Sequence, residues 1–500
     1  MSGARDRGSF CVRSAFIMGA EAVPVSVEVT IGGGLPNYTI IGMPDATVLE
    51  ARHRVDKAIR ACGFEGPHAH ITVNLAPAEL KKSGTGFDLP IAVAILAASG
   101  QIPTKGLKEC LFVGELGLQG EVCEVRGSFA YAMLASREGL RLVCAPMSIP
   151  ACLGSCECST LVALSRLRSG VGSLPGPVLQ REDDGAGGAL PNDTLDFSQV
   201  CDQEVAKRAL VVAAAGNHGI MMVGPPGAGK TMLARRLPTI LPPLTESERV
   251  EALMIHSVAA QPTESIARGE PPFRAPHHSI SRAGLVGGGK PVMPGEISLA
   301  HKGVLFLDEL PEFANNVLQS LRQPMEDKRV TIVRADGSYI FPSDFMFVAA
   351  ANPCPCGHLG DPGHACSCAP ARVESYQARM GGPLVNRIDI NIDVARPASR
   401  SVIEGDEGMS SAQMREMVLA ARDFRAHRLQ KGDDDRRPTT SFDPVALGAF
   451  ETIANRLAMG GRSIARAARV ARTIADIEGH QRVSKDDIIE ACSYRGRSHG

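Results

Sequence analysis

The chain lacks any apolar run long enough to cross a bilayer, because its longest, Leu89–Ala98, falls far short of the roughly 20 residues that a spanning helix needs. Residues 1–10 contain no apolar segment of the kind found in signal peptides. Neither charge is in excess, since 53 Lys and Arg residues face 54 Asp and Glu residues. We therefore expect a cytoplasmic protein without a membrane partner, in which any binding of nucleic acid depends on a local group of basic residues.

The 14 cysteines do not indicate a disulfide-stabilised secreted protein, because no export signal accompanies them. Four of them form two C-x-C pairs in a Gly- and Pro-rich stretch: Cys354, Cys356, Cys366 and Cys368. Thiols so close together in a reducing compartment favour a metal site, and Zn²⁺ is the ion that we expect. The alternative is a set of reduced, purely structural thiols, because the C-x-C spacing is tighter than that of a usual zinc knuckle.

One segment matches the phosphate-loop pattern G-x-x-x-x-G-K-[ST] without a mismatch: Gly224, Pro225, Pro226, Gly227, Ala228, Gly229, Lys230 and Thr231. It follows the apolar run Gly219–Val223 and precedes a helix-like stretch. In such a loop the backbone N–H groups surround the phosphates, the lysine neutralises their charge and the threonine hydroxyl ligates Mg²⁺. The pattern therefore predicts that ATP and Mg²⁺ bind here.

A second motif predicts hydrolysis as well as binding. The apolar run Val304–Leu307 is followed directly by Asp308 and Glu309, as in a buried parallel strand that carries acids at its carboxyl end. We expect Asp308 to hold the Mg²⁺ shell and Glu309 to polarise the attacking water, which are the two tasks that phosphoryl transfer to water requires.

The chain divides into four parts by composition and periodicity: an α+β domain at residues 1–168, a flexible linker at 169–196, an α/β core at 197–400 with a Cys-rich loop at 354–368, and a helical lid at 401–500. The linker prediction rests on Gly, Pro and acidic residues without an apolar period. Strands of the first domain are expected at 25–31, 70–75, 111–113 and 141–145, and its helices at 47–62, 90–99 and 128–138. Helices of the lid are expected near 411–430, 443–459, 463–478 and 485–492.

Two segments of the first domain, Val73–Ala78 and Lys82–Pro90, together with the phosphate loop and the acidic strand, resemble the magnesium-chelatase-like AAA+ ATPases of the ComM (YifB) family. The resemblance covers nearly the whole chain. It implies an AAA+ P-loop motor with a helical lid, preceded by an α+β domain similar to the proteolytic domain of Lon (ribosomal-protein-S5-domain-2-like). This domain is expected to lack protease activity, because Gly86 and Phe129 stand where the resemblance places the catalytic serine and lysine.

The same resemblance assigns roles to three further residues. Asn352, after the apolar strand 345–348, is expected to orient the lytic water; Arg387 resembles an arginine finger, and Arg462 a second sensor that closes on the nucleotide. Because the finger would reach the γ-phosphate of a neighbouring subunit, hydrolysis should need a homo-oligomer, which the family implies is a hexamer. The other arginines of this lid helix are expected on a solvated or intersubunit face: Arg466, Arg469 and Arg472.

Two insertions could touch a polymer in the central pore of such a ring. One contains Lys290 and resembles the helix-two insert of this group of motors. The other is a predicted hairpin with strands at 329–334 and 339–341 and a turn at Asp336-Gly337, and it corresponds to a hairpin that related helicases use on DNA. Lys290 and Arg334 are therefore the candidate DNA contacts, although a basic hairpin tip is often simply solvated.

Together these features predict an ATP-hydrolysing hexameric DNA motor, which in the family promotes branch migration during recombination in natural transformation. The alternative is a chelatase-type or chaperone-like remodeller that acts on a protein partner.

Overall fold

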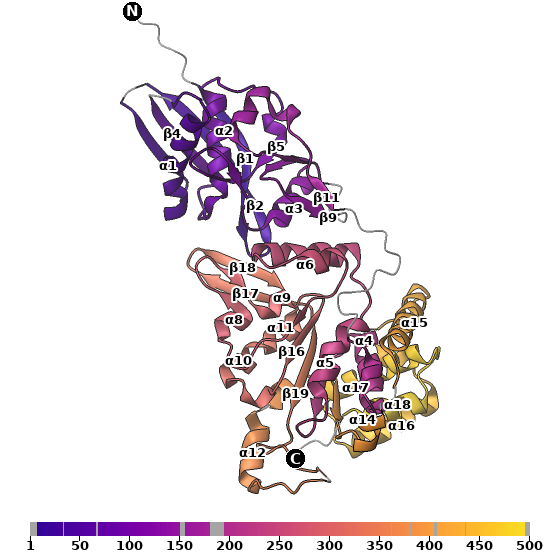
Figure 1. The fold of residues 1–500 in the computed structure, drawn as a ribbon. Coiled ribbons are helices and arrows are strands. Elements are labelled where there is room, and N and C mark those ends of the chain that lie inside the picture. Colours follow the sequence, from indigo (N-terminus) through magenta and orange to yellow (C-terminus); the bar gives the residue numbers. More distant parts are fainter. Residues whose placement is uncertain are drawn as a thin grey trace, which may run out of the picture.

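The computed structural model describes residues 8–33, 35–66, 69–150, 156–180, 195–361, 363–379, 382–385, 387–404, 408–435 and 437–495. The chain runs through an N-terminal region, a central region and a C-terminal group of helices (Figure 1). The mixed α/β fold with a parallel sheet confirms the predicted class.

The N-terminal region is built on a mixed seven-stranded sheet with the order β10-β8-β5-β1-β2-β4-β3. Its long antiparallel hairpin β1–β2 pairs from end to end, with Ser9 opposite Thr30 and Met18 opposite Glu21. The sequence prediction had missed β1, β3 and β10. The strands are β1 (Ser9–Met18), β2 (Glu21–Gly32), β3 (Asn37–Ile41), β4 (His70–Ala76), β5 (Cys110–Phe112), β8 (Arg141–Cys144) and β10 (Cys158–Thr160).

Helix α2 (Asp88–Ala98) is apolar on every side after its first residue, and it is accordingly buried along Leu89–Ala97. It packs with α1 (Ala46–Ala61) in the core of this region, and α3 (Ser128–Arg137) lies towards the central region. Of the predicted linker, residues 171–173 form a 3-10 turn and β11 (Val178–Gln180) pairs in parallel with β9 (Ser148–Pro150). Residues 181–194 of that linker lie outside the described residues.

The central region is an all-parallel five-stranded sheet with the order β13-β16-β19-β12-β20. Because all its strands run the same way, it has one carboxyl edge, where they end, and one amino edge, where they begin. The strands are β12 (Ile220–Val223), β13 (Phe273–Arg274), β16 (Val304–Leu307), β19 (Met346–Ala351) and β20 (Ile390–Asp393). The associated helices include α4 (Glu204–Gly216), α5 (Lys230–Arg236), α10 (Asn315–Ser320), α11 (Arg322–Asp327) and α12 (Pro370–Arg379).

The N-terminal region sits on two insertions of the central region, helix α6 (Glu246–Val258) and the hairpin of β17 (Arg329–Arg334) and β18 (Gly337–Pro342) (Figure 1). The Gly127 amide donates to the Ser257 carbonyl at 3.1 Å, and the Ala20 amide donates to the Ile340 carbonyl at 3.1 Å. A single apolar cluster also joins α3 to α6. The hairpin is real, but its turn is Ala335-Asp336, one residue earlier than predicted, because Gly337 pairs with Arg334.

The C-terminal helices agree with the predicted lid to within a few residues. They are α15 (Ser411–Gln430), α16 (Pro444–Arg456), α17 (Gly461–Ile477) and α18 (Lys485–Ser493). They share one buried core with α4, α5 and the sheet, so lid and core are packed together. No helix in the described part of the chain combines the length and the apolar character needed to cross a membrane.

Candidate active site

The phosphate loop connects the end of strand β12 to the start of helix α5 at the carboxyl edge of the central sheet, and its last two residues, Lys230 and Thr231, are the first of α5. Strand β12 is held on both sides by parallel neighbours, β19 and β20, so the start of the loop is fixed in the sheet. Gly227 and Gly229 have φ angles of 79° and 89°, which L side chains rarely adopt. Helix α5 begins at Lys230, so its free backbone N–H groups face the loop and offer a site for an anion.

The Lys230 ammonium lies inside this loop and is 8% exposed. It donates to the Gly224 carbonyl at 2.6 Å, to the Pro225 carbonyl at 3.0 Å and to Asn352 Oδ1 at 3.1 Å. Burial lowers the pKa of Lys230, and the carboxylates of Asp308 and Glu309 oppose this shift. A cation is thus held among oxygen acceptors, where an anionic ligand would compete for it.

The predicted acids follow the wholly buried strand β16. Thr231 Oγ1 donates to Asp308 Oδ2 at 2.7 Å, so the hydroxyl and the carboxylate already lie within one metal shell of each other. Asp308 Oδ1 also accepts the Glu309 amide at 3.0 Å. Glu309 has a φ of 52° and its side chain is 57% exposed, so its carboxylate is accessible to water.

His278 lies beside Glu309, a neighbour that sequence reasoning did not find. Its Nδ1 is 3.6 Å from Glu309 Oε2, and its ring meets Phe313 edge-on with centroids 6.4 Å apart. The His277-His278 pair follows β13 in the chain, but the contact depends on the pairing of β13 with β16. Nothing in the local sequence signals that pairing.

The structure brings Asn352 into the same site. Strands β12 and β19 are paired with Val223 opposite Ala351, so the phosphate loop and Asn352 leave the sheet side by side. The predicted residues Lys230, Thr231, Asp308, Glu309 and Asn352 therefore converge at the carboxyl edge.

Arg387 and Arg462 lie elsewhere. Both line a cavity of about 750 Å³ that also includes Gly219 and Phe345, the residues just before β12 and β19. This is the amino edge, so neither arginine reaches the phosphate loop of its own chain. Arg387 pairs with Glu326, with Nε and Nη2 each 2.8 Å from Oε1.

The amino edge carries further arginines in the same cavity. Asp389 lies 3.5 Å from Arg466 and 3.7 Å from Arg469. Burial opposes the ionisation of Asp389, but His218 and these arginines lower its pKa overall. Arg462 is exposed and has no ion-pair partner in the described residues. The cavity wall thus presents cationic side chains with only a few carboxylates between them.

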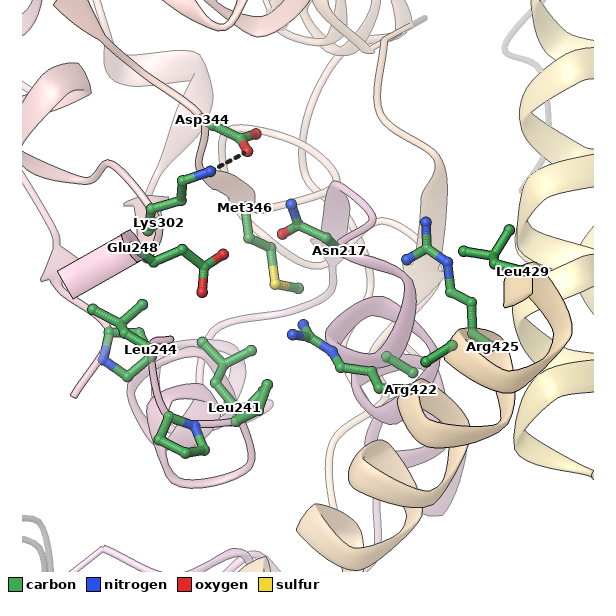
Figure 2. A pocket seen from close by; sticks show the side chains of 16 residues that line it. Asn217, Leu241, Leu244, Glu248, Lys302, Asp344, Met346, Arg422, Arg425 and Leu429 are labelled. Atoms are coloured by element: carbon green, nitrogen blue, oxygen red, sulfur yellow. Dashed lines mark hydrogen bonds and ion pairs between the residues drawn. The ribbon is translucent and has the colours of Figure 1, made fainter. Parts of the chain in front are cut away.

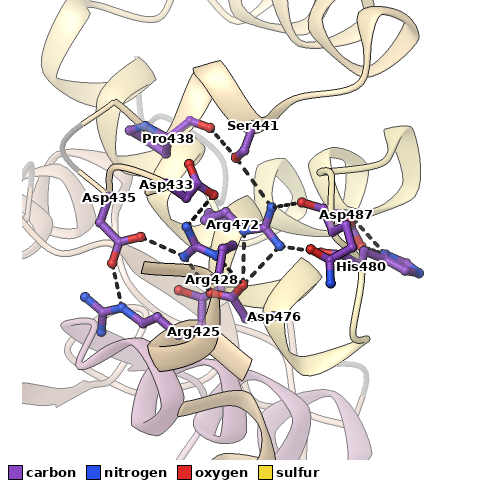
Figure 3. A network of polar contacts seen from close by, with 12 residues as sticks. Arg425, Arg428, Asp433, Asp435, Pro438, Ser441, Arg472, Asp476, His480 and Asp487 are labelled. Carbon is purple, nitrogen blue, oxygen red and sulfur yellow. Dashed lines mark hydrogen bonds and ion pairs between the residues drawn. The ribbon is translucent and has the colours of Figure 1, made fainter. Parts of the chain in front are cut away.

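One of the predicted surface arginines proves to be structural. Arg472 is 3% exposed and lies 3.0 Å from Asp476, which also accepts from Arg428 at 3.1 Å (Figure 3). Asp433 and Asp435 close the network, each 2.7 Å from an Arg428 nitrogen. Ion pairs with Arg428 therefore hold the acidic segment after α15, which contains Asp433 and Asp435, against that helix.

A smaller cavity, of about 340 Å³, also lies towards the amino edge. Arg422 and Arg425 of α15 face it from one side, and the Lys302–Asp344 ion pair of 3.2 Å from another (Figure 2). Arg422 Nη2 donates to the Ala214 carbonyl at 2.8 Å. None of the residues predicted for hydrolysis lines it.

The four cysteines after Asn352 form a compact cluster. The Sγ atoms of Cys354, Cys356 and Cys366 lie 3.4–3.7 Å apart. Cys368 joins them, with all four sulfurs within 4.8 Å. Tetrahedral Zn–S bonds of about 2.3 Å would set sulfurs roughly 3.8 Å apart, so the donor set fits Zn²⁺. His358, Asp361 and His364 form a second group of converging side chains in the same loop.

The two candidate DNA contacts, Lys290 and Arg334, are both exposed. Lys290 follows β14 (Gly287–Gly288), which pairs with β15 (Met293–Pro294). A side chain carbon placed on Gly288 would lie 3.8 Å from Arg334 Nη2, so the tip of the β17–β18 hairpin adjoins this insertion.

In the N-terminal region, the two positions of the expected dyad hold no nucleophile. Gly86 is buried in a 3-10 turn and Phe129 is buried in α3. Lys82 is enclosed and donates to the Pro77 carbonyl, and burial lowers its pKa.

Comparison with known proteins gives matches to three family models. Residues 27–148 match the model described as subunit ChlI of Mg-chelatase, and residues 196–402 match the model described as magnesium chelatase, subunit ChlI. Residues 408–495 match the model of the C-terminal part of magnesium chelatase subunit ChlI. The chain is 39% identical to competence protein ComM of Haemophilus influenzae, over 97% of both chains. It is 38% identical to the uncharacterised protein YifB of Escherichia coli, over 97% of this chain and 96% of that one. A magnesium-chelatase 67 kDa subunit of Heliobacterium mobile is 28% identical over 34% of this chain and 30% of its own.

Proposed function

The chain belongs to the magnesium-chelatase-like family that includes ComM and YifB, and on that premise we propose that it is a hexameric ATPase that moves on DNA and promotes branch migration during recombination in natural transformation. The observation that carries the proposal is that the predicted site residues of the chain lie at two opposite edges of the central sheet. The residues predicted to bind the nucleotide and to activate water lie at one edge of the sheet. The predicted arginine finger, Arg387, and the predicted second sensor, Arg462, lie at the other.

Hydrolysis is assigned to the carboxyl edge. Lys230 neutralises the β- and γ-phosphates, and the amides at the start of α5 hold them. Mg²⁺, held by Thr231 and Asp308, would neutralise the charge that develops on the phosphate oxygens. Glu309 accepts a hydrogen bond from the attacking water, and Asn352 orients that water against the γ-phosphate.

The amino edge is assigned to the neighbouring subunit's nucleotide. A triphosphate carries several negative charges, and the cavity with Arg387 and Arg462 presents the cations to receive them. Stacking the amino edge of one subunit on the carboxyl edge of the next completes each site and closes a ring. Arg462 therefore acts, in this proposal, on the neighbour's nucleotide together with Arg387.

Zn²⁺ is proposed at Cys354, Cys356, Cys366 and Cys368. The thiolates would cross-link a loop that contains neither helix nor strand in its described residues 353–361 and 363–369. A metal supplies there the stability that a hydrophobic core supplies elsewhere.

DNA contact is assigned to Lys290 and Arg334. They are exposed on adjoining insertions, so a ring brings several copies together around one axis. This would concentrate positive charge locally in a chain whose net charge is only −1.

The alternative is a chelatase-type or chaperone-like remodeller of a protein partner, a reading supported by the matches to chelatase subunit models. The likeness to ComM over nearly the whole chain favours the DNA motor.

The deciding experiment measures ATP turnover with and without single-stranded, duplex and forked DNA, together with DNA affinity across a salt series. We expect stimulation by DNA and an affinity that falls steeply with salt. The double variant Lys290→Ala with Arg334→Ala should bind more weakly, and the slope of log affinity against log salt should fall by roughly 0.7 per lost contact with a single strand. Arg482→Ala with Lys485→Ala removes the same charge from an exposed part of the lid and is the matched control. Neither binding at low salt nor stimulation in the wild type would reject the DNA motor.

A further inference from the structure

The cysteine cluster lies against the phosphate loop. The sequence did not indicate this contact. The loop that carries the thiols starts directly after Asn352, whose Oδ1 accepts from Lys230 at 3.1 Å. One residue earlier, the Ala351 carbonyl accepts the Gly224 amide at 3.2 Å. The same piece of chain thus contacts the first glycine and the lysine of the phosphate loop before it enters the cluster.

A second contact lies inside the cluster itself. Gly357, between the two C-x-C pairs, is so close to Pro226 that a Cβ built on it would lie 2.5 Å from the proline Cδ. The Gly357 amide donates to the Cys354 carbonyl at 2.9 Å, and Cys354 is fully buried. Movement of the cysteines would therefore move Gly357, against which Pro226 packs.

Arg396, just after β20, joins the rest of this loop to the same residue. Its Nη2 donates to the Pro226 carbonyl at 3.2 Å, and the guanidinium lies 3.6 Å from Asp361 and 3.3 Å from His364 Nδ1. The Asp361 side chain is only 4% exposed. Pro226 is thus held from one side by the cysteine loop and from another by an arginine that the loop positions.

We propose that the loop 353–368, when its four thiolates hold Zn²⁺, forms the outer wall of the phosphate loop, so that ATP binding depends on the metal. The inference rests on the proposed nucleotide and zinc sites and concerns their coupling. A phosphate loop binds ATP tightly only if its backbone amides already point at the phosphates. If the cysteine loop no longer packs against the phosphate loop, that preorganisation is lost. Loss of zinc would then weaken ATP binding although no cysteine touches the nucleotide.

The first test compares two glycines of the loop. Gly357 and Gly360 have φ angles of 83° and 79°, so alanine strains the backbone in both, but nothing lies within 4 Å of a Cβ on Gly360. Gly357→Ala should weaken binding of a fluorescent ATP analogue about tenfold, whereas Gly360→Ala should stay within about twofold of the wild type. Equal affinities in the two variants would overturn the proposal.

Two further variants distinguish a specific effect on ATP binding from misfolding of the loop. Arg396→Ala removes the donor to the Pro226 carbonyl and leaves the thiols intact, so it should weaken ATP binding at unchanged zinc content. Arg400→Ala, which breaks only an exposed ion pair with Glu404, is its control. Zinc content and Tm are measured for every variant.

The second test removes the metal. The purified protein is treated with a zinc chelator and dialysed into Mg²⁺, and ATP-analogue affinity is measured before and after Zn²⁺ is restored. We expect about one zinc per chain, about tenfold weaker binding without it, and recovery on its return. Less than about 0.2 equivalents of zinc with tight ATP binding, or unchanged affinity in the stripped protein, would overturn the coupling. If the wild type itself binds no ATP, the proposed function fails; if only its DNA binding is absent, the coupling can still be measured.

Discussion

The two edges of the central sheet differ in how far each is complete within one chain. At the carboxyl edge the functional groups already contact each other: Lys230 binds Asn352, and Thr231 binds Asp308. At the amino edge Arg462 has no ion-pair partner in the described residues and shares its cavity with six more arginines. The cations that line this cavity outnumber its carboxylates, an arrangement that suits an anion from outside the chain. The difference supports a site that two subunits build together.

The largest effect is expected from removing the cation of the carboxyl edge. Lys230→Ala should abolish measurable ATP binding, and with it all turnover, because no other cation of the described residues is held inside the loop. Titration with a fluorescent ATP analogue measures it. Lys105→Ala, an exposed lysine of the N-terminal region, is the control and should bind normally. Tight binding by the Lys230 variant would break the assignment of this edge.

The next prediction tests whether the edges belong to different subunits. Arg387→Ala alone should lower ATP turnover by about a thousandfold, as for other arginine fingers. An equal mixture with Lys230→Ala protomers should regain activity, because about a quarter of random contacts then join an intact loop to an intact finger. Turnover of the mixture against each variant alone is the measurement. No recovery, after mass analysis confirms mixed rings, would mean that Arg387 does not act across the boundary.

Glu309→Gln should separate binding from chemistry at the carboxyl edge. The amide keeps the shape but cannot accept the proton of the attacking water, so ATP should bind normally while turnover falls at least about tenfold, or 1.4 kcal/mol. Single-turnover kinetics with bound ATP tests this directly. Glu312→Gln, a nearby acid of the turn after β16, is the control. Normal turnover in Glu309→Gln would contradict the role of this carboxylate.

The smallest effect on turnover should come from disturbing the ion pairs of Arg428 and Arg472 near the amino edge, which should change stability instead. Asp476→Asn leaves Arg428 and Arg472 without a shared buried carboxylate, which should cost about 3 kcal/mol and lower Tm by several degrees. Glu478→Gln breaks an ion pair in which Glu478 is 45% exposed, so its Tm should hardly change.

Arg462→Ala completes this comparison. It removes an exposed cation that has no ion-pair partner in the described part of the chain, so Tm should stay the same while ATP turnover falls. A large loss of Tm in Arg462→Ala would show that this arginine is structural, like Arg472.

The sequence alone determined the elements whose signal is local. The phosphate loop is contiguous, the buried strand ends directly in its acids, and the lid helices follow from the periodicity of their residues. The thiols of the cysteine cluster also lie close together in the chain. Short-range spacing sets such features, because the backbone geometry of one loop or one turn is enough to place the side chains.

Only the tertiary structure decided what depends on pairing between distant segments. Register across β12 and β19 brought Asn352 to Lys230. The packing of α17 against α4 put Arg462 in the cavity that Arg387 also lines, instead of at the phosphate loop. The same holds for Arg472, which looked like a surface residue until Arg428 and Asp476 enclosed it. A helical period shows which residues share a face, but it does not show which element covers that face, because the covering element lies far away in the chain.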